Sequence, residues 1–331
     1  MRFGFVVSLQ YPPGAAAAAF AARLRLAHSL GFASFWTNQH FLASPYQVLQ
    51  PLPVLGRLSA EIPDAQLGCV VLLPLYLPVL LAEELASIDI LSVGRLVCAL
   101  ALGYRDLENE ALGSPARQRV GRFNEALQIV KGLWSGETFR FDGRYYRIPE
   151  CQGTLLPVQR PCPPFWIAAN NDPAIERAAR IADAWLISPH SRLAVVKRQM
   201  EVFRAARAAA GRSFPAAVPI RRDAYVAPTE SEAREHAERY FGDKYETYRQ
   251  WGQERALPAD DRFSGSFAEL SDDRLLIGTP ERIRDDLARY RDEVGITDVV
   301  LRLDPAGMPL DLVERSLRLF GEKVLPAVAT N

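Results

Sequence analysis

Three polar side chains that could take part in chemistry, Asn38, Gln39 and His40, follow directly after an apolar segment, Ala33 to Thr37. The segment is predicted to be a buried strand, because Gly31 ends the helix before it. In a barrel of parallel strands, side chains at the carboxyl ends of the strands converge on a ligand. The imidazole of His40 exchanges protons near neutral pH, which makes it the first candidate for acid–base chemistry. Position alone does not separate this role from that of a structural histidine that caps a helix or binds a loop.

A second polar junction, Asn170 to Pro173, separates the apolar segment Phe165 to Ala169 from a predicted helix, Ala174 to Ala182. Proline in the first helical turn leaves free backbone N–H groups beside it, and such groups can bind a phosphate. Asn171 or Asp172 could instead cap the helix through its side chain. Because Asp172 would also repel an anion, the residues alone leave both alternatives open.

The composition is that of a globular enzyme with a full hydrophobic core. Of 331 residues, 49% are hydrophobic and 24% are charged, and both values are ordinary for such proteins. Lys and Arg together number 39, as do Asp and Glu together, so the chain lacks the basic excess expected of a nucleic-acid-binding protein. Reduced thiols and a cytoplasmic location are expected, since no zinc-site or disulfide spacing is found among Cys69, Cys98, Cys151 and Cys162.

No membrane or targeting segment is expected. The longest apolar run, Leu67 to Ala82, contains Pro74 and Pro78 and is shorter than the roughly 20 residues that a membrane helix needs. The apolar start of the chain is too short before Gln10 to be a signal peptide, and a strand explains it better.

The chain alternates between short apolar segments and helical segments. Each predicted strand is a nearly continuous apolar run, as is typical of a parallel sheet covered by helices. Strands are predicted over Arg2–Ser8, Ala33–Thr37, Leu67–Leu73, Leu96–Leu102, Phe165–Ala169, Trp185–Ser188, Pro219–Val226 and Thr297–Leu303. The helices are predicted over Ala15–Leu30, Pro78–Leu91, Arg117–Trp134, Ala174–Ala182, Leu193–Ala210, Glu230–Ala256, Pro280–Val294 and Leu310–Leu325, with one more ending near Ala60. This pattern predicts an α/β fold, a (β/α)8 TIM barrel, as one domain over residues 1–331.

Two segments interrupt this alternation. Residues 135–148 contain Asp142-Gly143 between aromatic and basic residues, which predicts a β-hairpin insertion. After the seventh strand, a second insertion covers about residues 240–274 and ends in an irregular stretch that contains Gly265. An insertion at that point lies over the mouth of a barrel and is expected to be a mobile lid.

Five segments, in the same order along the chain, carry a resemblance to a known family. They are GFASFWTNQHF, LGCVVLLPLYLPVLLAEELASIDILSVGRL, LGYRDLENEALG, PPFWIAANNDPAIERAARIADAWLISP and IGTPERIRDDLARYRDEVGITDVVL. Together they resemble the bacterial luciferase-like superfamily of flavin-dependent monooxygenases and oxidoreductases. The resemblance implies a luciferase-like TIM barrel with insertions.

The resemblance assigns roles to several candidate residues. His40 matches the family's active-site histidine after the second strand. Cys69, Val70 and Val71 lie where the family often has a non-proline cis peptide against the flavin ring. Such a bond costs roughly 3–4 kcal/mol and persists only where packing or a ligand enforces it. The resemblance also implies contacts to the cofactor from residues at the ends of other strands, Tyr104, Ser188, Asn170 and Asn171. The two asparagines would bind the flavin phosphate.

Two positions depart from the family pattern. Gln39 stands where many relatives carry an acid, which puts in doubt any mechanism that needs a carboxylate there. Leu102 stands where luciferase itself directs an arginine toward the flavin phosphate, and Arg105 is the candidate to replace it.

The implied reaction uses reduced FMN, supplied by a separate flavin reductase, together with dioxygen. A flavin hydroperoxide would transfer one oxygen atom to a small molecule, while the protein holds the ring and keeps water out. His40 would act as a general acid or base or as a hydrogen-bond partner. Trp36, Phe41 and Tyr104 are expected at the mouth of the barrel and would favour an apolar or aromatic substrate, although aromatic residues in a barrel often serve packing alone.

Two alternatives remain open. The same superfamily includes oxidoreductases that use a 5-deazaflavin for hydride transfer, and the absence of an arginine at Leu102 leaves room for this cofactor. A flavin-binding protein without catalysis is also compatible with the fold. A homodimer is expected from the resemblance, although no apolar stripe in the sequence demands one.

Overall fold

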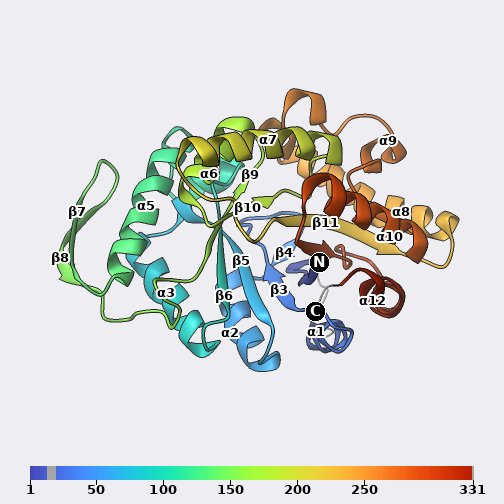
Figure 1. Ribbon diagram of the computed structural model, residues 1–331, viewed down its shortest axis with the longest axis horizontal. Coiled ribbons are helices and arrows are strands. Elements are labelled where there is room, and N and C mark those ends of the chain that lie inside the picture. Colours follow the sequence, from blue (N-terminus) through green and yellow to red (C-terminus); the bar gives the residue numbers. More distant parts are fainter. Residues whose placement is uncertain (13–19, 330–331) are drawn as a thin grey trace.

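Eight parallel strands form a closed barrel in this computed structural model, which describes residues 1–12 and 20–329 (Figure 1). They pair in the order β10, β9, β6, β5, β3, β1, β13, β11, and β10 also pairs with β11, which closes the ring. The predicted (β/α)8 barrel is confirmed, and each predicted strand is present with ends that differ by at most two residues. The strands are β1 (Arg2–Val6), β3 (Ser34–Thr37), β5 (Gln66–Leu72), β6 (Leu96–Ala101), β9 (Phe165–Ala169), β10 (Ala184–Ile187), β11 (Pro219–Val226) and β13 (Asp298–Arg302).

Helices cover the outside of the barrel (Figure 1). The predicted helix Ala15–Leu30 is present from Phe20 onward, and residues 15–19 lie outside the described part of the chain. Within residues 1–12 and 20–329, no helix combines the length and apolar character needed to cross a membrane. The helices are α1 (Phe20–Ser29), α2 (Pro51–Glu61), α3 (Pro78–Leu91), α5 (Arg119–Trp134), α6 (Asp172–Ile181), α7 (Leu193–Ala209), α8 (Glu230–Gln250), α10 (Pro280–Arg289), α11 (Leu310–Leu319) and α12 (Leu325–Val328), with π turns at Tyr290–Val294 and Phe320–Val324.

Several short elements were not predicted from the sequence. Helix α4 (Asp106–Ala111) lies where only a polar turn was expected, because the residues that it buries are Glu108 and Asn109, which produce no apolar period. Strand β12 (Leu276–Gly278) extends the sheet from β11 outside the barrel. An antiparallel pair joins β2 (Gln10–Tyr11) to β4 (Gln47–Val48). Such short elements depend on tertiary partners rather than on local sequence.

Both predicted insertions are present. The hairpin consists of β7 (Thr138–Asp142) and β8 (Arg147–Gln152), so its second strand ends four residues beyond the predicted segment, and it projects from the left edge of Figure 1. The second insertion contains the end of α8, 3-10 turns at Gln253–Ala256 and Ala259–Asp261, and the short helix α9 (Phe267–Ser271). The predicted helix over residues 230–256 therefore ends earlier, at Gln250.

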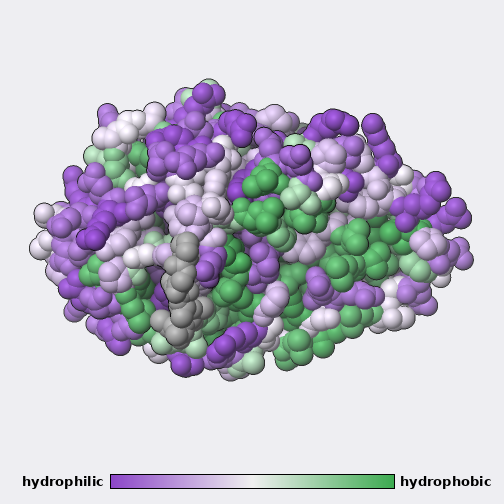
Figure 2. Space-filling model, turned by 180° about the vertical axis from the view of Figure 1, so that it is seen from behind, coloured by the Kyte–Doolittle hydropathy of each residue, from purple (hydrophilic) through white to green (hydrophobic). Residues whose placement is uncertain are grey.

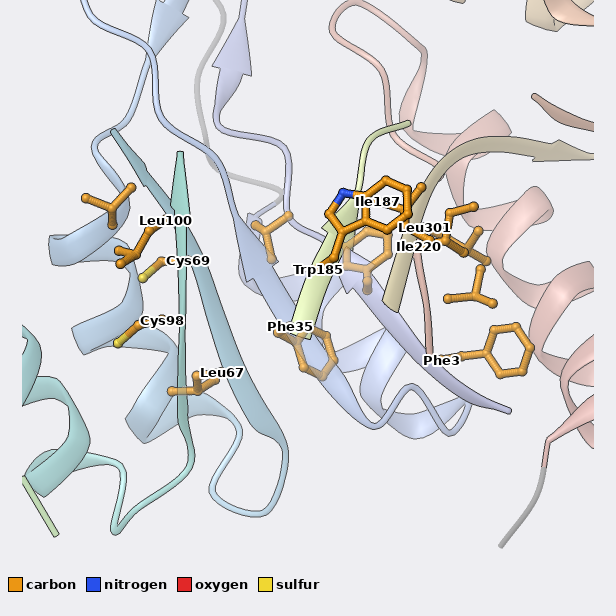
Figure 3. Close-up of a cluster of buried hydrophobic side chains, with 14 of the residues drawn as sticks. Phe3, Phe35, Leu67, Cys69, Cys98, Leu100, Trp185, Ile187, Ile220 and Leu301 are labelled. Carbon is orange, nitrogen blue, oxygen red and sulfur yellow. The ribbon is translucent and has the colours of Figure 1, made fainter. Parts of the chain in front are cut away.

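Outward-pointing strand side chains form the main core between the barrel and the helices (Figure 3). Their period of two along each strand places alternate residues in this layer and in the barrel lumen. Side chains of the outer layer include Phe3, Phe35, Leu67, Cys69, Cys98, Leu100, Trp185, Ile187, Ile220 and Leu301.

Two stacked indole rings fill the lower part of the barrel lumen. The ring centroids of Trp36 and Trp166 are 5.1 Å apart with an interplanar angle of 24°, and small apolar side chains such as Ala99 and Val300 surround them. Gly68 makes room for this pair, since a Cβ atom there would lie 2.2 Å from Cε3 of Trp36. The indole pair is the floor of the space that opens above it.

Replacement of Gly68 by alanine is therefore expected to lower the free energy of unfolding by about 1–3 kcal/mol, because the added methyl group overpacks the lumen. Chemical denaturation of both proteins measures the difference. Gly56→Ala is the matched control, because Gly56 lies within α2 with nothing within 4 Å of an added Cβ. That change should raise stability by about 0.5–1 kcal/mol, and equal stability of the Gly68→Ala and wild-type proteins would contradict the account of the floor.

Candidate active site

A cavity opens at the carboxyl ends of the barrel strands. Its volume is about 230 Å³, just below the roughly 300–1000 Å³ that is common for small-molecule pockets. This end of a TIM barrel is where ligands bind. The lining residues lie on β5, β6, β9, β10, β11 and β13, in the loops that follow the strands and in the helices above them, and they include Asn38, Val70, Tyr104, Asn170, Ser188, Arg221 and Arg302.

The imidazole of His40 is fixed at the edge of this cavity by Glu108. Nδ1 of His40 lies 3.1 Å from Oε1 of Glu108. Because an ionised carboxylate only accepts hydrogen bonds, Nδ1 carries a proton and donates it. Nε2 has no hydrogen-bond partner within the described part of the chain, and the ring lines the cavity. Nε2 is therefore the atom at which His40 can exchange a proton with a ligand.

The carboxylate of Glu108 is a buried hub for this corner of the site. Its Oε1 also accepts hydrogen bonds from the backbone N–H of Phe41 at 2.9 Å and from Nη1 of Arg105 at 3.0 Å. Burial alone would raise the pKa of Glu108, but the hydrogen bonds from His40 and Phe41 and the charge of Arg105 outweigh burial and hold that pKa below its usual value. Glu108 is thus ionised at neutral pH and keeps the imidazole in one orientation.

Arg105 supports the loop instead of lining the cavity, and its expected role toward a phosphate is corrected. Its guanidinium donates to the carbonyl oxygens of Phe41 at 2.7 Å and Leu42 at 3.2 Å, and it lies 4.1 Å from the ring centroid of Trp251. The guanidinium of Arg105 therefore faces the loop after β3, Glu108 and Trp251 of the insertion. The arginine near this edge that does line the cavity is Arg119 of α5.

Gln39 and Asn38 face different surroundings. The amide oxygen of Gln39 accepts from the backbone N–H of Leu72 at 2.9 Å, and its amide nitrogen donates to the hydroxyl of Tyr76. A neutral amide can donate and accept at once. Gln39, at the position where many relatives carry an acid, therefore connects the loop after β3 to the end of β5 by hydrogen bonds. Asn38 lines the cavity, and its Oδ1 atom is buried without a hydrogen-bond partner among the described residues.

Only Val70 of the three residues expected on β5 faces the cavity. Cys69 and Val71 point outward into the main core, as Figure 3 shows for Cys69, and burial raises the pKa of the Cys69 thiol to about 12. The expected non-proline cis peptide is wrong. Cis bonds in the described residues occur only before Pro45 and Pro161, and β5 pairs with β6 in parallel register from Leu67 to Leu72.

The other predicted cofactor residues, Tyr104, Asn170, Asn171 and Ser188, all line the cavity. Asn171 also caps α6, because its Oδ1 accepts from the backbone N–H of Ala174 at 3.2 Å. Asp172 is turned away from the cavity by its ion pair with Arg198, at 2.7 Å. The helix-cap alternative is therefore correct for Asn171, and the neighbouring acid does not face the cavity.

Two of the three aromatic residues expected at the mouth lie elsewhere. Trp36 belongs to the floor of the lumen, and Phe41 does not line the cavity. Tyr104 does line it, with a hydroxyl that is buried and without a partner in the described residues. The insertion adds Tyr248, which is stacked on Trp251 with ring centroids 5.5 Å apart. Residues of the insertion thus line the cavity, and its role as a mobile lid stays a prediction.

Comparison with known proteins gives the family. The sequence pattern described as luciferase-like monooxygenase matches residues 1–297. This chain belongs to the luciferase-like monooxygenase family. The luciferase-like protein is therefore an oxidoreductase, and its cavity lies where a TIM-barrel enzyme has its active site.

Relatives of this luciferase-like protein differ in their reactions. The oxygenase component of a flavin-dependent trigonelline monooxygenase from Acinetobacter baylyi is 25% identical over 311 residues, which cover 90% of this chain and 86% of the relative. A phthiodiolone/phenolphthiodiolone dimycocerosates ketoreductase from Mycobacterium bovis is 28% identical over 383 aligned residues, covering 98% and 96%. The crystal structure of monooxygenase RslO1 from Streptomyces bottropensis matches with a TM-score of 0.83 and 25% identity, covering 99% of this chain and 100% of that chain. Family membership alone therefore does not fix the reaction or the substrate.

The luciferase-like cavity suits a flavin chemically. A flavin presents an apolar ring edge and a hydrogen-bonding edge, and FMN adds a phosphate. Val70 and Leu72 give the cavity an apolar wall, while Oδ1 of Asn38 and the hydroxyl of Tyr104 are buried polar atoms that a ligand would satisfy. The residues present fit the cofactor that the family implies.

Sequence reasoning missed most of the charged residues of the luciferase-like cavity. A signal was present in β11, where Arg221, Arg222 and Asp223 interrupt an otherwise apolar strand. Lys244 and Tyr248 are four residues apart on α8 and so share one face of that helix. The charged or titratable lining residues that were missed are Arg119, His190, Arg221, Asp223, Lys244, Tyr248, Arg255 and Arg302.

Glu108→Gln should lower the free energy of unfolding by about 3 kcal/mol at neutral pH, because it removes one partner of a buried ionic contact. The depressed pKa of Glu108 means that its contribution is fully present above the unfolded-state value and is lost as the pH falls through the folded-state value. The difference in the free energy of unfolding between the wild type and the variant should therefore become smaller below about pH 4. Chemical denaturation of both proteins at several pH values measures this difference.

Glu110→Gln is the matched control, since Glu110 is an exposed glutamate of the same helix. It should leave stability unchanged at every pH. A Glu108→Gln difference that stays constant down to the lowest pH tested would show that the carboxylate charge is not the stabilising element.

Proposed function

We propose that this protein is a flavin-dependent monooxygenase that binds reduced FMN in the cavity and oxygenates a small organic molecule. The observation that carries the proposal is the fixed imidazole of His40 on the wall of a cavity that suits a flavin. FMN, once reduced, supplies the reaction with dioxygen that side chains cannot perform.

The described residues divide the work of holding FMN. Asn170, Asn171 and Ser188 would bind the phosphate end, assisted by the guanidinium of Arg119. Val70 would contact the ring. The phosphate would meet neutral donors and one cation there, while Asp172 is held away by Arg198.

His40 would deliver or remove a proton at Nε2. Glu108 sets the direction of the ring and keeps the proton on Nδ1, because its carboxylate accepts that hydrogen bond. The insertion that carries Tyr248 and Trp251 covers this corner, so that water is kept from the reacting atoms.

A separate flavin reductase would supply the reduced cofactor. The trigonelline relative is named as the oxygenase component of its enzyme, and we extend that arrangement to this chain. Hydride transfer with a 5-deazaflavin is the second candidate function, and the relative named as a ketoreductase favours it.

Anaerobic titration of the purified protein with reduced FMN, and separately with a reduced 5-deazaflavin, tests the proposal. Saturable binding of reduced FMN is expected, followed by incorporation of 18O from dioxygen into a substrate. His40→Gln should leave FMN affinity unchanged but slow oxygenation by about 10²- to 10⁴-fold, the range that a positioned proton donor contributes.

His28→Gln is the control for this variant, because His28 lies on α1 in an ion pair with Asp64, outside the cavity. Its oxygenation rate should equal that of the wild type. Binding of the deazaflavin alone would replace the proposal by hydride transfer, and oxygenation by His40→Gln at the wild-type rate would remove His40 from the reaction.

We also propose that the protein forms a homodimer through α3. Several apolar side chains of this helix are exposed: Leu80 is half exposed and Leu91 more exposed still, and Leu77 and Val93 are exposed at its two ends. Hydrophobic surface is visible over the side of the molecule that carries α2 and α3 (Figure 2). An exposed apolar face of this kind is typical of a protein contact.

Leu80→Glu combined with Leu91→Glu should shift the protein to a monomer in analytical ultracentrifugation, because charge in the contact is costly to desolvate. Phe214→Glu, at an exposed phenylalanine outside this face, should not. A wild-type protein that sediments as a monomer at all concentrations would contradict the dimer.

A further inference from the structure

The charged residues that line the cavity are strongly unbalanced. They comprise one carboxylate, Asp223, and five cations, Arg119, Arg221, Lys244, Arg255 and Arg302. Arg255 contacts Asp106 at the surface, but three of the cations lie together on β11, α8 and β13. Arg221, Lys244 and Arg302 form what we call the cationic layer, directly above the indole floor of the lumen.

Asp223 is the carboxylate that lines the cavity beside this layer, and a second one, Asp304, is buried near Arg302 and raises its pKa. Asp223 is engaged by Nζ of Lys244 and accepts a further hydrogen bond from the hydroxyl of Tyr245 at 3.2 Å. Within the described residues neither Arg221 nor Arg302 has an ion-pair partner, and the Nε atom of each is buried without a hydrogen bond. Arg302 is 4% exposed; its Nη1 donates to the amide oxygen of Gln10 at 3.3 Å, and its guanidinium also contacts the hydroxyl of Tyr248. Two guanidinium groups therefore lie beside the cavity with unused donors.

These guanidinium groups keep their charge. Burial lowers the pKa of Arg221 only to about 10, which still leaves it protonated at neutral pH. Burial also opposes the charge of Arg302, but the neighbouring Tyr248 and Asp223 outweigh it and raise that pKa. An unpaired buried cation is costly, so an anion that enters the layer gains unusually strong interactions.

The pKa values of two neighbouring side chains, Tyr248 and His190, are shifted by the positive charge of the cationic layer. Burial would raise the pKa of the Tyr248 phenol, yet the charges of Arg302 and Lys244 bring it below its usual value. Burial lowers the pKa of His190 far below its usual value, and Lys244, Arg221, Arg274 and Arg302 lower it further, so this ring stays neutral. The field stabilises a negative charge and excludes an additional positive one.

We propose that the cationic layer binds the anionic group of the substrate, and that the substrate is a small organic carboxylate. That the bound anion is a substrate rests on the proposed function, whereas the binding of an anion to the cationic layer does not. It revises the expectation of an apolar or aromatic substrate: the substrate also carries a negative charge, which is held at the side of the lumen formed by β11 and β13.

The position of the layer connects the anion to the reacting corner. The ring of Tyr248 lies next to the cationic layer, and its centroid is 6.1 Å from that of His40. The asparagines assigned to the FMN phosphate follow β9, and two strands, β10 and β11, separate β9 from β13 in the ring. A carboxylate on Arg221 and Arg302 would thus place the rest of the substrate beside the ring of Tyr248, on the side of the cavity that leads to the imidazole of His40.

Isothermal titration of the full chain with benzoate and with its neutral counterpart benzamide tests the inference, without FMN and then with saturating FMN. Benzoate should bind and benzamide should bind at least about tenfold more weakly. Arg221→Gln and Arg302→Gln should each weaken benzoate about tenfold to a hundredfold, the value of a hydrogen bond to a charged group. Benzamide affinity should not change.

Two further variants test whether the loss of benzoate binding is specific to the guanidinium groups of the cationic layer. Arg302→Lys keeps the charge and should retain the preference for benzoate, whereas Arg291→Gln, which removes an exposed arginine paired with Asp292, should behave as wild type. Thermal unfolding without ligand should show Arg221→Gln at least as stable as wild type, because an unpaired buried charge is removed. Equal affinity for benzoate and benzamide, or a preference that survives both glutamine variants, would overturn the proposal.

The flavin phosphate is the other possible source of an anion, and the same experiment separates it. If FMN competes with benzoate while riboflavin does not, and Arg302→Gln weakens FMN but not riboflavin, the layer binds the phosphate and the proposal is overturned. If benzoate binds as expected but FMN does not bind at all, the proposed flavin function fails while the anion site stands.

Discussion

The stacked indoles of Trp36 and Trp166 divide the barrel lumen into a packed lower half and an open upper half. Apolar side chains such as Ala99 and Val300 surround them, and the hydroxyl of Ser34 accepts a hydrogen bond from Nε1 of Trp36 at 2.9 Å. Above them β11 and β13 carry Arg221, Asp223 and Arg302, which line the cavity. The floor thus determines the depth of the cavity, and it allows charged residues to face a space that a ligand can fill instead of a closed core.

A second constraint fixes the reacting corner. The carboxylate of Glu108 is buried, ionised and shared by His40, the backbone of Phe41 and Arg105. It joins the loop after β3 to α4, and Arg105 in turn stacks on Trp251 of the insertion. One charged group therefore sets the orientation of the imidazole and links the cover of the cavity to its wall. Such a network is strong only because each charge in it has a partner.

The barrel could be predicted from the sequence because a strand buried on both faces is apolar throughout, and each such run is visible without knowledge of its neighbours. The hairpin could be predicted because Asp142-Gly143 favours a tight turn locally. The same reasoning missed α4, whose buried residues are polar, and it assigned Arg105 to a phosphate although its hydrogen bonds go to Phe41 and Leu42. It also placed Cys69 and Val71 toward a cofactor, because a one-residue difference in the direction of a strand side chain cannot be read from an unbroken apolar run.

The sequence by itself determined the eight strands, their helices and the polar residues that follow the strands, since these depend on local periodicity and turn chemistry. Only the tertiary structure decided which of those residues meet. His40 and Glu108 are 68 positions apart, and Asp223 meets Lys244 only because α8 folds back over the mouth. The excess of positive charge in the cavity is likewise invisible in a chain with 39 basic and 39 acidic residues. It arises because the fold leaves one carboxylate among the cavity's five cations and pairs most other acids elsewhere.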